Sequence, residues 1–308
     1  MRDKQTGEKR RAITVLDAAM GRALSTKGVE IPGTIWSANA LIVAPDVVVD
    51  IHRENIAAGA RIITTNTYGV IRSDLAKENI EDQFIVLNQL AGELAQRAVR
   101  ESGKSNLQIA GSLPPLNGSF RPDRVLEREI TDPLYREQAG ALADYVDLFI
   151  CETMSTITEG LSAAEAALST GKPVIVAFTL HDEKPGCLKS GELLQDAVKA
   201  LSHLELLGVM ANCSLPERVS DAMPVLVSSG LEMVGGYANT FTKVPKDFLL
   251  DGEKETDRKL DLRDDLPPEY YVKFVEEWVA NGANIVGGCC GTTSAHTKAI
   301  CTHFRLSE

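Results

Sequence analysis

The sequence predicts a single-domain (β/α)8 barrel from its alternating pattern. Eight short β-rich runs alternate with longer segments whose apolar residues recur at helical spacing. Several of the β-rich runs are continuously apolar, as expected for parallel strands that are buried on both faces. A length of 308 residues is common for this barrel, and no Pro/Gly/Ser-rich linker divides residues 1–308. A doubly wound open sheet is the main alternative.

The predicted elements follow one another in eight β-then-α units. The strands cover residues 13–16, 61–65, 107–110, 147–151, 173–178, 208–211, 231–235 and 283–287. The helices between them have apolar residues three and four positions apart, and glycines follow several of these patterns as stop signals. The stronger helical patterns cover 80–98, 193–204 and 274–279, and the weaker ones cover 46–58, 133–145, 157–169, 216–227 and 293–304.

Two connections are longer than the others. Residues 21–44 follow the first strand and residues 240–268 follow the seventh, at the end of a barrel where long loops can cover a substrate. Residues 251–265 (DGEKETDRKLDLRDD) are expected to form a solvated surface excursion, because their charges would be costly to bury. Residues 1–11 are polar and basic, so we expect a frayed tail and not a signal peptide.

The composition excludes several classes of partner. Apolar residues make up 44% of the chain and charged residues 24%, as in ordinary soluble proteins. A formal net charge of −11 argues against nucleic acid or an anionic membrane as the main partner. No apolar run approaches the roughly 18 residues that span a bilayer. Six cysteines without a dense framework suit a reducing compartment. We therefore expect a cytoplasmic protein that binds small molecules and could form a homo-oligomer.

Polar residues gather at the predicted carboxyl ends of the strands. In strand order they are Asp17, Asn66, Ser112, Glu152, Cys213, Asn239 and the pair Cys289–Cys290. The carboxyl ends of all strands of a (β/α)8 barrel lie on one face, and active sites are built on that face. The pattern therefore supports the barrel and an enzymatic function together.

Three cysteines on this face are candidates for a metal site. Cys289 and Cys290 are adjacent in the glycine-rich segment GGCCGT, and adjacent cysteines make a poor disulfide because the ring they close conflicts with disulfide geometry. Both thiolates can instead face one soft metal ion. Cys213 at the end of the sixth strand would supply a third ligand. Three thiolates and a vacant fourth position are typical of a zinc site that performs chemistry.

The other cysteines and the histidines have simpler interpretations. We expect Cys151 to pack within the barrel, Cys187 to lie in a loop and Cys301 to pack a helix. None of the five histidines stands at metal-ligand spacing from a partner, and we expect His181, the one near the same face, to be a loop residue.

Asp17 and Glu152 are carboxylates at the ends of core strands, and two interpretations are open. The structural one is helix capping or a hydrogen bond that holds the strand end. The functional one is capture of a substrate ammonium by two groups that only accept hydrogen bonds when ionised. General acid or base catalysis would require a raised pKa, which a sequence does not reveal.

The motifs LDAAMG, TTNTY, GSLPP, ETM, NCS and GGCCGT, in this order, resemble those of the zinc-dependent homocysteine S-methyltransferases. The match extends from Ile13 to Thr292. The resemblance implies one zinc ion on the three candidate cysteines and binding of the homocysteine amino group by Asp17 and Glu152. The other substrate-binding residues that it implies are Ala18, Ala19, Asn66, Ser112, Asn239 and Gly288.

The resemblance also implies a reaction, the transfer of a methyl group to the zinc-bound thiolate of homocysteine to give methionine. A free thiol with a pKa of about 8.5 is mostly protonated near neutral pH, and coordination to zinc removes its proton. A sulfonium donor, S-methylmethionine or S-adenosylmethionine, would leave as a neutral thioether. No separate protein base is therefore expected.

The chain departs from the family pattern near its start. Ala18 and Ala19 stand where the family usually has glycines, and Arg22 stands where it commonly has threonine. An alanine keeps its N–H at negative φ, but its methyl group narrows the pocket. These departures leave open the zinc-dependent methylation of another small thiol or selenol. A non-catalytic zinc-binding or thiol-binding barrel is the alternative from a different class. A dithiol redox role is disfavoured because the pair lacks CxxC spacing.

Overall fold

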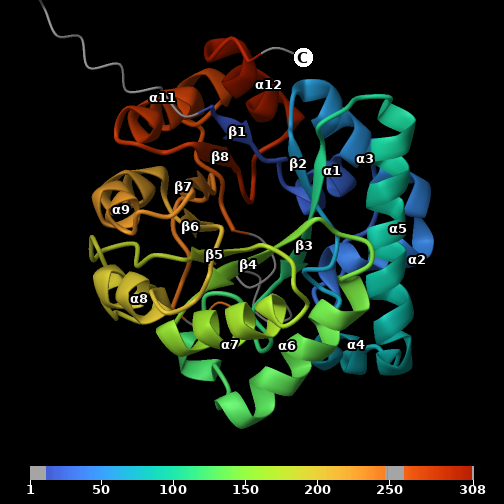
Figure 1. Ribbon diagram of the computed structural model, residues 1–308. Coiled ribbons are helices and arrows are strands. Elements are labelled where there is room, and N and C mark those ends of the chain that lie inside the picture. The colour runs from blue at the N-terminus through green and yellow to red at the C-terminus, as the bar shows by residue number, and fades with distance from the viewer. Residues whose placement is uncertain (1–11, 247, 249–259, 307–308) are drawn as a thin grey trace, which may run out of the picture.

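Eight parallel strands form one sheet in residues 12–246, 248 and 260–306, which the computed structural model describes (Figure 1). The strand order is β1-β8-β7-β6-β5-β4-β3-β2. A parallel bridge between Leu16 and Ile62 joins the two outer strands, and Arg61 N–H donates to Val15 O at 2.8 Å on the same seam. The sheet therefore curves into a barrel, and the predicted (β/α)8 fold is confirmed.

Each strand forms within a few residues of its predicted position. The strands are β1 (Thr14–Val15), β2 (Ile62–Thr64), β3 (Gln108–Leu113), β4 (Leu148–Met154), β5 (Val174–Phe178), β6 (Gly208–Asn212), β7 (Met233–Ala238) and β8 (Ile285–Gly288). Strands β3, β4 and β7 extend beyond the predicted carboxyl ends. Their extensions lie on the face that carries the polar strand-end residues.

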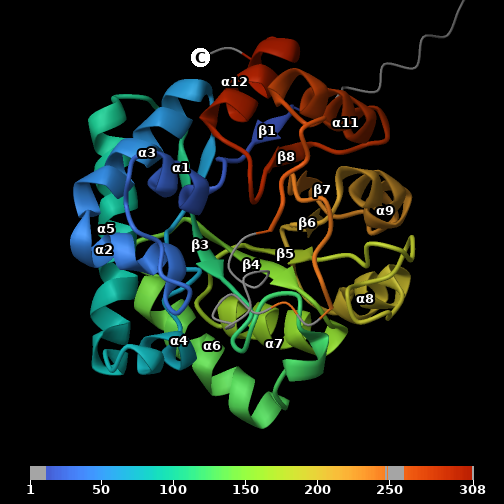
Figure 2. The ribbon, with the colours of Figure 1, turned by 180° about the vertical axis from the view of Figure 1, so that it is seen from behind.

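The helices surround the sheet in both views (Figure 2). They are α1 (Met20–Thr26), α2 (Asn39–Val43), α3 (Pro45–Ala58), α4 (Arg72–Lys77), α5 (Phe84–Ser102), α6 (Arg128–Leu142), α7 (Ile157–Leu168), α8 (Leu194–Leu201), α9 (Pro216–Ser228), α11 (Pro268–Ala280) and α12 (Ser294–His303). The long connection predicted at 21–44 contains all of α1 except Met20, the 3-10 helix η1 (Trp36–Ala38) and α2. Among the described residues, no helix is both long and apolar enough to cross a membrane.

Alternate residues of each strand pack into two separate layers. The barrel interior contains side chains such as Ile150, Ile175 and Met210, and the outer layer between strands and helices contains Phe149 and Cys151. Because neighbouring strand residues point to opposite faces, Glu152 shares the inward side with Ile150. The expectation that Cys151 packs within the barrel is therefore wrong.

The loops and the other cysteines lie largely as expected. Cys187 lies in the loop between β5 and α8, and Cys301 is buried on α12. Most of the predicted charged excursion, 251–265, lies outside the described residues, as does the predicted tail 1–11. In the described part of the excursion, Arg263 pairs with Glu217 on α9 at 2.7 Å.

Candidate metal and substrate site

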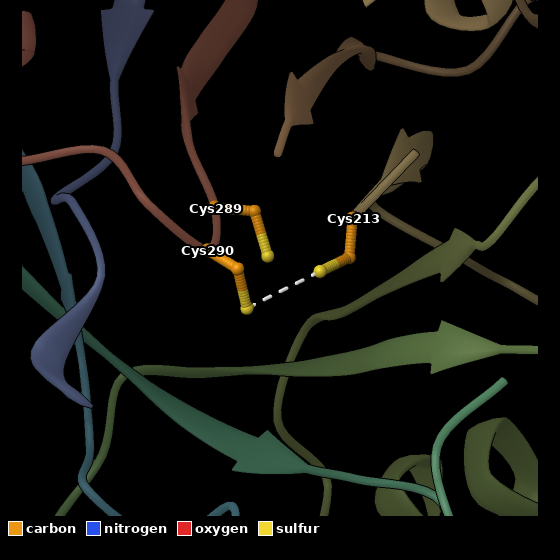
Figure 3. A group of neighbouring side chains, drawn as sticks. All are labelled: Cys213, Cys289 and Cys290. Atoms are coloured by element: carbon orange, nitrogen blue, oxygen red, sulfur yellow. Dashed lines mark hydrogen bonds between the residues drawn. The ribbon is translucent and has the colours of Figure 1, made fainter. Parts of the chain in front are cut away.

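The three candidate cysteines converge at the carboxyl face of the barrel (Figure 3). Cys213 follows β6, whereas Cys289 and Cys290 follow β8. The Sγ atoms of Cys213 and Cys290 are 3.5 Å apart, and all three sulfurs lie within 4.8 Å of one another. A tetrahedral zinc ion with Zn–S bonds of about 2.3 Å places its sulfur ligands roughly 3.8 Å apart. The donor set and spacing therefore fit one soft metal ion.

The backbone of Cys213 adopts an uncommon conformation. Its φ is 44°, in the left-handed region that non-glycine residues rarely occupy. Thr153, at the end of β4, has a φ of 62° and is held by the side chain of Asn212. The Cys213 N–H donates to Tyr237 O at 3.0 Å. Such conformations persist only where the surroundings enforce them, and here they turn the end of β6 toward the end of β8.

The Cys289–Cys290 turn is held by hydrogen bonds to its backbone. Cys289 N–H donates to Ala238 O at 2.8 Å, and the Thr292 hydroxyl donates to Cys289 O at 2.6 Å. A Cβ atom at Gly288 would lie 2.7 Å from the Cβ of Thr292 and overlap its hydroxyl. The close approach explains the glycine that precedes the cysteine pair.

Tyr271 of α11 connects the carboxyl ends of β7 and β8 through hydrogen bonds. Its buried hydroxyl donates to Gly287 O at 2.8 Å and accepts from Ala238 N–H at 2.9 Å. The sequence analysis missed this role, because nothing in a helical pattern indicates which strand carbonyl a tyrosine reaches. Tyr271 thus fixes β7 and β8 relative to each other just before Cys289.

The three thiols perturb one another strongly. Hydrogen bonds from Cys213 and then Cys289 hold the pKa of Cys290 well below its ordinary value. The pKa of Cys289 lies well above its ordinary value, because its thiol is hydrogen-bonded to Cys213 and Cys290. The cluster therefore stabilises a thiolate at Cys290, and the thiolate is the form that binds metals.

Asp17 and Glu152 lie on the same face with defined hydrogen-bond partners. Thr64 donates to Asp17 twice, from its N–H to Oδ2 at 2.8 Å and from its hydroxyl to Oδ1 at 2.9 Å. The Ser112 hydroxyl donates to Glu152 Oε1, and the Tyr237 hydroxyl donates to Glu152 Oε2 at 3.2 Å. Both carboxyls retain lone pairs that could accept further hydrogen bonds.

Asp17 and Glu152 both have raised pKa values, so a charge beside them can change their ionisation. Asp17 and Glu152 are each only 9% exposed, and burial raises the pKa of each to about 7. The charge of Glu152 contributes to the raised pKa of Asp17, so the two groups sense each other. A cation placed between them would favour their ionised forms.

Ala18 and Ala19 directly follow Asp17 in the chain. Ala18 N–H donates to Oδ1 of Asn55 at 3.1 Å, so the protein itself uses this donor. Ala19 precedes α1 with a φ of −57°, a conformation open to alanine as well as glycine. Arg22 is exposed on α1. The departures from the family glycines therefore cost no backbone strain at Ala19.

Asn66 and Asn239 are buried at strand ends, where they hold loops. Asn66 Nδ2 donates to Ser37 O at 2.8 Å and ties the first long connection to β2. Asn239 Oδ1 accepts from Phe241 N–H at 3.1 Å. Both follow the carboxyl ends of their strands, and these contacts hold the loops that begin there.

An apolar cover lies over the cysteines. Phe120, Val244 and Phe248 pack in one cluster with Cys213, and Cys289 and Cys290 lie against it. The rings of Phe120 and Phe248 meet edge to face with centroids 6.1 Å apart. This cover shields the sulfurs in part, because Cys213 is buried while Cys289 and Cys290 are half-buried. Val244 and Phe248 belong to the long connection after β7, at the end of the barrel where long loops can cover a substrate.

An aromatic pair that the sequence analysis did not single out borders the site. Trp36 and Tyr68 meet edge to face with ring centroids 5.5 Å apart. The Tyr68 hydroxyl is hydrogen-bonded to the Ser119 hydroxyl at 2.7 Å. Burial raises the pKa of Tyr68, and the charges of Cys213 and Glu152 raise it further, which places the ring beside the cysteine–carboxylate site.

Comparisons with known proteins give a consistent result. A family model described as homocysteine S-methyltransferase matches residues 14–304. The homocysteine S-methyltransferase of Escherichia coli (strain K12) is 29% identical, with 94% of each chain covered. The metallated form of the E. coli homocysteine methyltransferase MmuM superposes with a TM-score of 0.80 at 25% identity, over 96% of this chain and 97% of that chain. The oxidized form of MmuM gives a TM-score of 0.79 at 25% identity, over 94% and 96% of the two chains.

Proposed function

This chain belongs to the homocysteine S-methyltransferase family, and we propose that it is a zinc-dependent enzyme that methylates homocysteine to methionine with a sulfonium donor. The observation that carries the proposal is the convergence of three cysteine sulfurs beside two buried carboxyls. The sulfurs suit a metal, and the carboxyls suit the amino group of an amino-acid substrate.

The proposed zinc ligands are Cys213, Cys289 and Cys290. Their spacing fits one ion, and the lowered pKa of Cys290 favours the thiolate form that binds a metal. A zinc ion at this position would supply Lewis-acid chemistry that lowers the pKa of the acceptor thiol. The apolar cover of Phe120 and Phe248 would limit the access of water to the reacting sulfur.

Asp17 and Glu152 are proposed to bind the ammonium of homocysteine. Ser112 and Tyr237 orient Glu152, while Thr64 orients Asp17, so each carboxylate is held in place before the substrate arrives. Anchoring the amino group directs the other end of the molecule toward the cysteine sulfurs. Holding the acceptor sulfur in a fixed position in this way lowers the entropy cost of its reaction with the donor methyl group.

The Trp36–Tyr68 pair supports a sulfonium as the methyl donor. Aromatic faces attract cations, and Tyr68 of this pair lies close enough to Cys213 and Glu152 to sense their charges. The acceptor sulfur forms a bond to the methyl carbon as the donor's carbon–sulfur bond breaks. The electron pair of that bond stays on the donor sulfur, which leaves as a neutral thioether, and the acceptor's thiol proton passes to solvent. S-methylmethionine and S-adenosylmethionine both meet this requirement.

The test is a donor panel with homocysteine, with the metal content measured on the same preparation. We expect about one zinc per chain, methionine formation with a sulfonium, and loss of both metal and turnover in Cys290→Ala. The matched control is Cys187→Ala, which changes a loop cysteine outside the cluster and should keep zinc and activity.

Three outcomes would contradict the proposal. Full activity in metal-free protein would exclude the zinc-dependent reaction. Faster methylation of another thiol or selenol than of homocysteine would reassign the acceptor. Bound zinc without methyl transfer from any donor would indicate a binding protein.

A further inference from the structure

A small pocket opens beside Tyr68, on the loops that follow β1, β2 and β3. It has a volume of about 80 Å³, and its walls include Trp36, Tyr68, Asn117, Ser119 and Arg124. The space is several times the minimum that one water molecule needs. Two of its walls are the rings of Trp36 and Tyr68, and Tyr68 senses the charges of Cys213 and Glu152 at the proposed methyl-transfer site. The pocket is therefore placed to receive a part of the donor that lies beyond the sulfonium.

Arg124 gives this pocket a net positive charge, because its two other charged lining residues, Asp74 and Lys77, pair with each other. In the described parts of the chain, the guanidinium of Arg124 makes no ion pair, whereas nearby Arg121 pairs with Asp123 at 2.6 Å and Lys77 pairs with Asp74 at 2.7 Å. Arg124 differs from these two cations because it lines the pocket without a carboxylate partner at ion-pair distance. Its five N–H donors therefore remain available to an anionic group.

The backbone around Arg124 is held in place. Asn117 Nδ2 donates to Arg124 O at 2.9 Å, and Arg124 N–H donates to Arg121 O at 2.9 Å. Gly118, which lies between them in the loop, has a φ of 104°. The guanidinium extends from a turn with defined hydrogen bonds, so less freedom is lost when it binds a ligand.

We propose that Arg124 binds the carboxylate of the methyl donor, and that the enzyme thereby selects sulfonium compounds that carry a carboxylate, such as S-methylmethionine. A guanidinium binds a carboxylate with two parallel charge-assisted hydrogen bonds. The aromatic pair holds the cationic centre, while Arg124 holds the anionic end of the same molecule. The inference rests on the proposed sulfonium donor and adds a residue that favours donors with a carboxylate over donors without one.

The experiment measures donor binding directly by calorimetry on the zinc-loaded protein. The ligands are S-methylmethionine and trimethylsulfonium, which has the same cationic centre but no carboxylate. We expect Arg124→Gln to weaken S-methylmethionine binding about 10–100-fold, the usual effect of losing hydrogen bonds to a charged group. Trimethylsulfonium binding should stay within about twofold, and Arg124→Lys should recover part of the loss.

The matched control is Arg22→Gln. Arg22 is an exposed arginine on α1, near the same face, and it is a rival partner for a substrate carboxylate. The inference is overturned if Arg22→Gln weakens S-methylmethionine binding and Arg124→Gln does not. It is also overturned if Arg124→Gln weakens both ligands equally, because the effect would then be structural.

Failure of the proposed function gives a different result. In that case the unmodified enzyme neither binds S-methylmethionine nor transfers its methyl group, and the assignment of Arg124 falls with it. Thermal unfolding of each variant shows whether it is folded. Should Arg124→Gln not fold, Arg124→Lys serves in its place, because it keeps the charge and loses the two-pronged geometry.

Discussion

Asn212 and Thr153 exchange two hydrogen bonds across the carboxyl ends of β6 and β4. Thr153 N–H donates to Asn212 Oδ1 at 2.8 Å, and Asn212 Nδ2 donates to Thr153 Oγ1 at 2.9 Å. Asn212 is fully buried and immediately precedes Cys213. The pair lies where Thr153 and Cys213 both adopt left-handed backbone conformations. We infer that Asn212 holds Cys213 in position for the other two cysteines.

Replacing Asn212 by leucine is expected to weaken metal binding. Leucine has a similar shape but leaves the buried Thr153 N–H without an acceptor, which should lower the free energy of unfolding by about 1–3 kcal/mol. Loss of a group that orients a ligand typically weakens metal binding about 10–100-fold. Competition with a chromophoric chelator measures the zinc affinity.

Asn284→Leu is the matched control for this change. Asn284 is buried at the amino-terminal end of β8 and makes two similar hydrogen bonds, to Val234 and Glu232. It should lose comparable stability without a change in zinc affinity. Equal losses of zinc affinity in both variants would show that Asn212 acts through general stability alone.

Gly288→Ala should disturb the cysteine turn. The new methyl group would collide with Thr292, so the turn must shift, at a cost of about 1–3 kcal/mol in unfolding free energy. Gly140→Ala is the control, because an added Cβ on the exposed side of α6 meets nothing within 4 Å and should stabilise the helix by about 0.5–1 kcal/mol. Urea unfolding and zinc content, measured on both variants, distinguish Gly288→Ala from Gly140→Ala. Normal stability and zinc content in Gly288→Ala would contradict the tight turn.

Binding of the amino group should strengthen as the pH rises. Below a pH of about 7, Asp17 and Glu152 are neutral because burial raises their pKa, and neutral carboxyls are poor acceptors for an ammonium. The product methionine has no thiol to titrate, so its dissociation constant between pH 6 and 8 isolates this effect. We expect tighter binding at pH 8. In Asp17→Asn the affinity should fall about 10-fold with a flatter pH profile. A pH-independent affinity in the unmodified enzyme would argue against ammonium binding there.

Glu159 on α7 should make the protein less stable as the pH rises. Burial raises its pKa from 4.5 to about 7, so the folded state holds a proton that the unfolded state releases between these values. Stability from this group is therefore present at low pH and lost as the pH rises through the window. Glu159→Gln can still accept the hydrogen bonds from Ser155, and it should be more stable than the parent at pH 8 by about 1–3 kcal/mol.

Urea unfolding at pH 5 and pH 8 checks the Glu159 prediction. The advantage of Glu159→Gln should shrink toward pH 5. The control is Glu129→Gln on the exposed side of α6, which should change stability little at either pH. An equal effect of Glu159→Gln at both pH values would contradict the linkage.

Much of the fold and the cysteine cluster could be predicted because both depend on order along the chain. Continuous apolar runs identified the strands, and the parallel barrel then brought Cys213 and the Cys289–Cys290 pair to one face, although 77 residues separate Cys213 from Cys290. The orientation of Cys151 was also predictable in principle. It is adjacent to Glu152, and neighbouring strand residues point to opposite faces.

The remaining features depend on contacts between side chains from distant segments. Neither the left-handed turn at Cys213 nor the hydroxyl of Tyr271 on the carbonyl of Gly287 leaves a periodic signal in the sequence. The pairing of Trp36 with Tyr68 likewise follows from how the loop after β1 folds back over β2. Periodicity along the chain determines which face of the barrel carries the chemistry. The distances and pKa values on that face arise only when packing brings the loops together and removes water from Asp17 and Glu152.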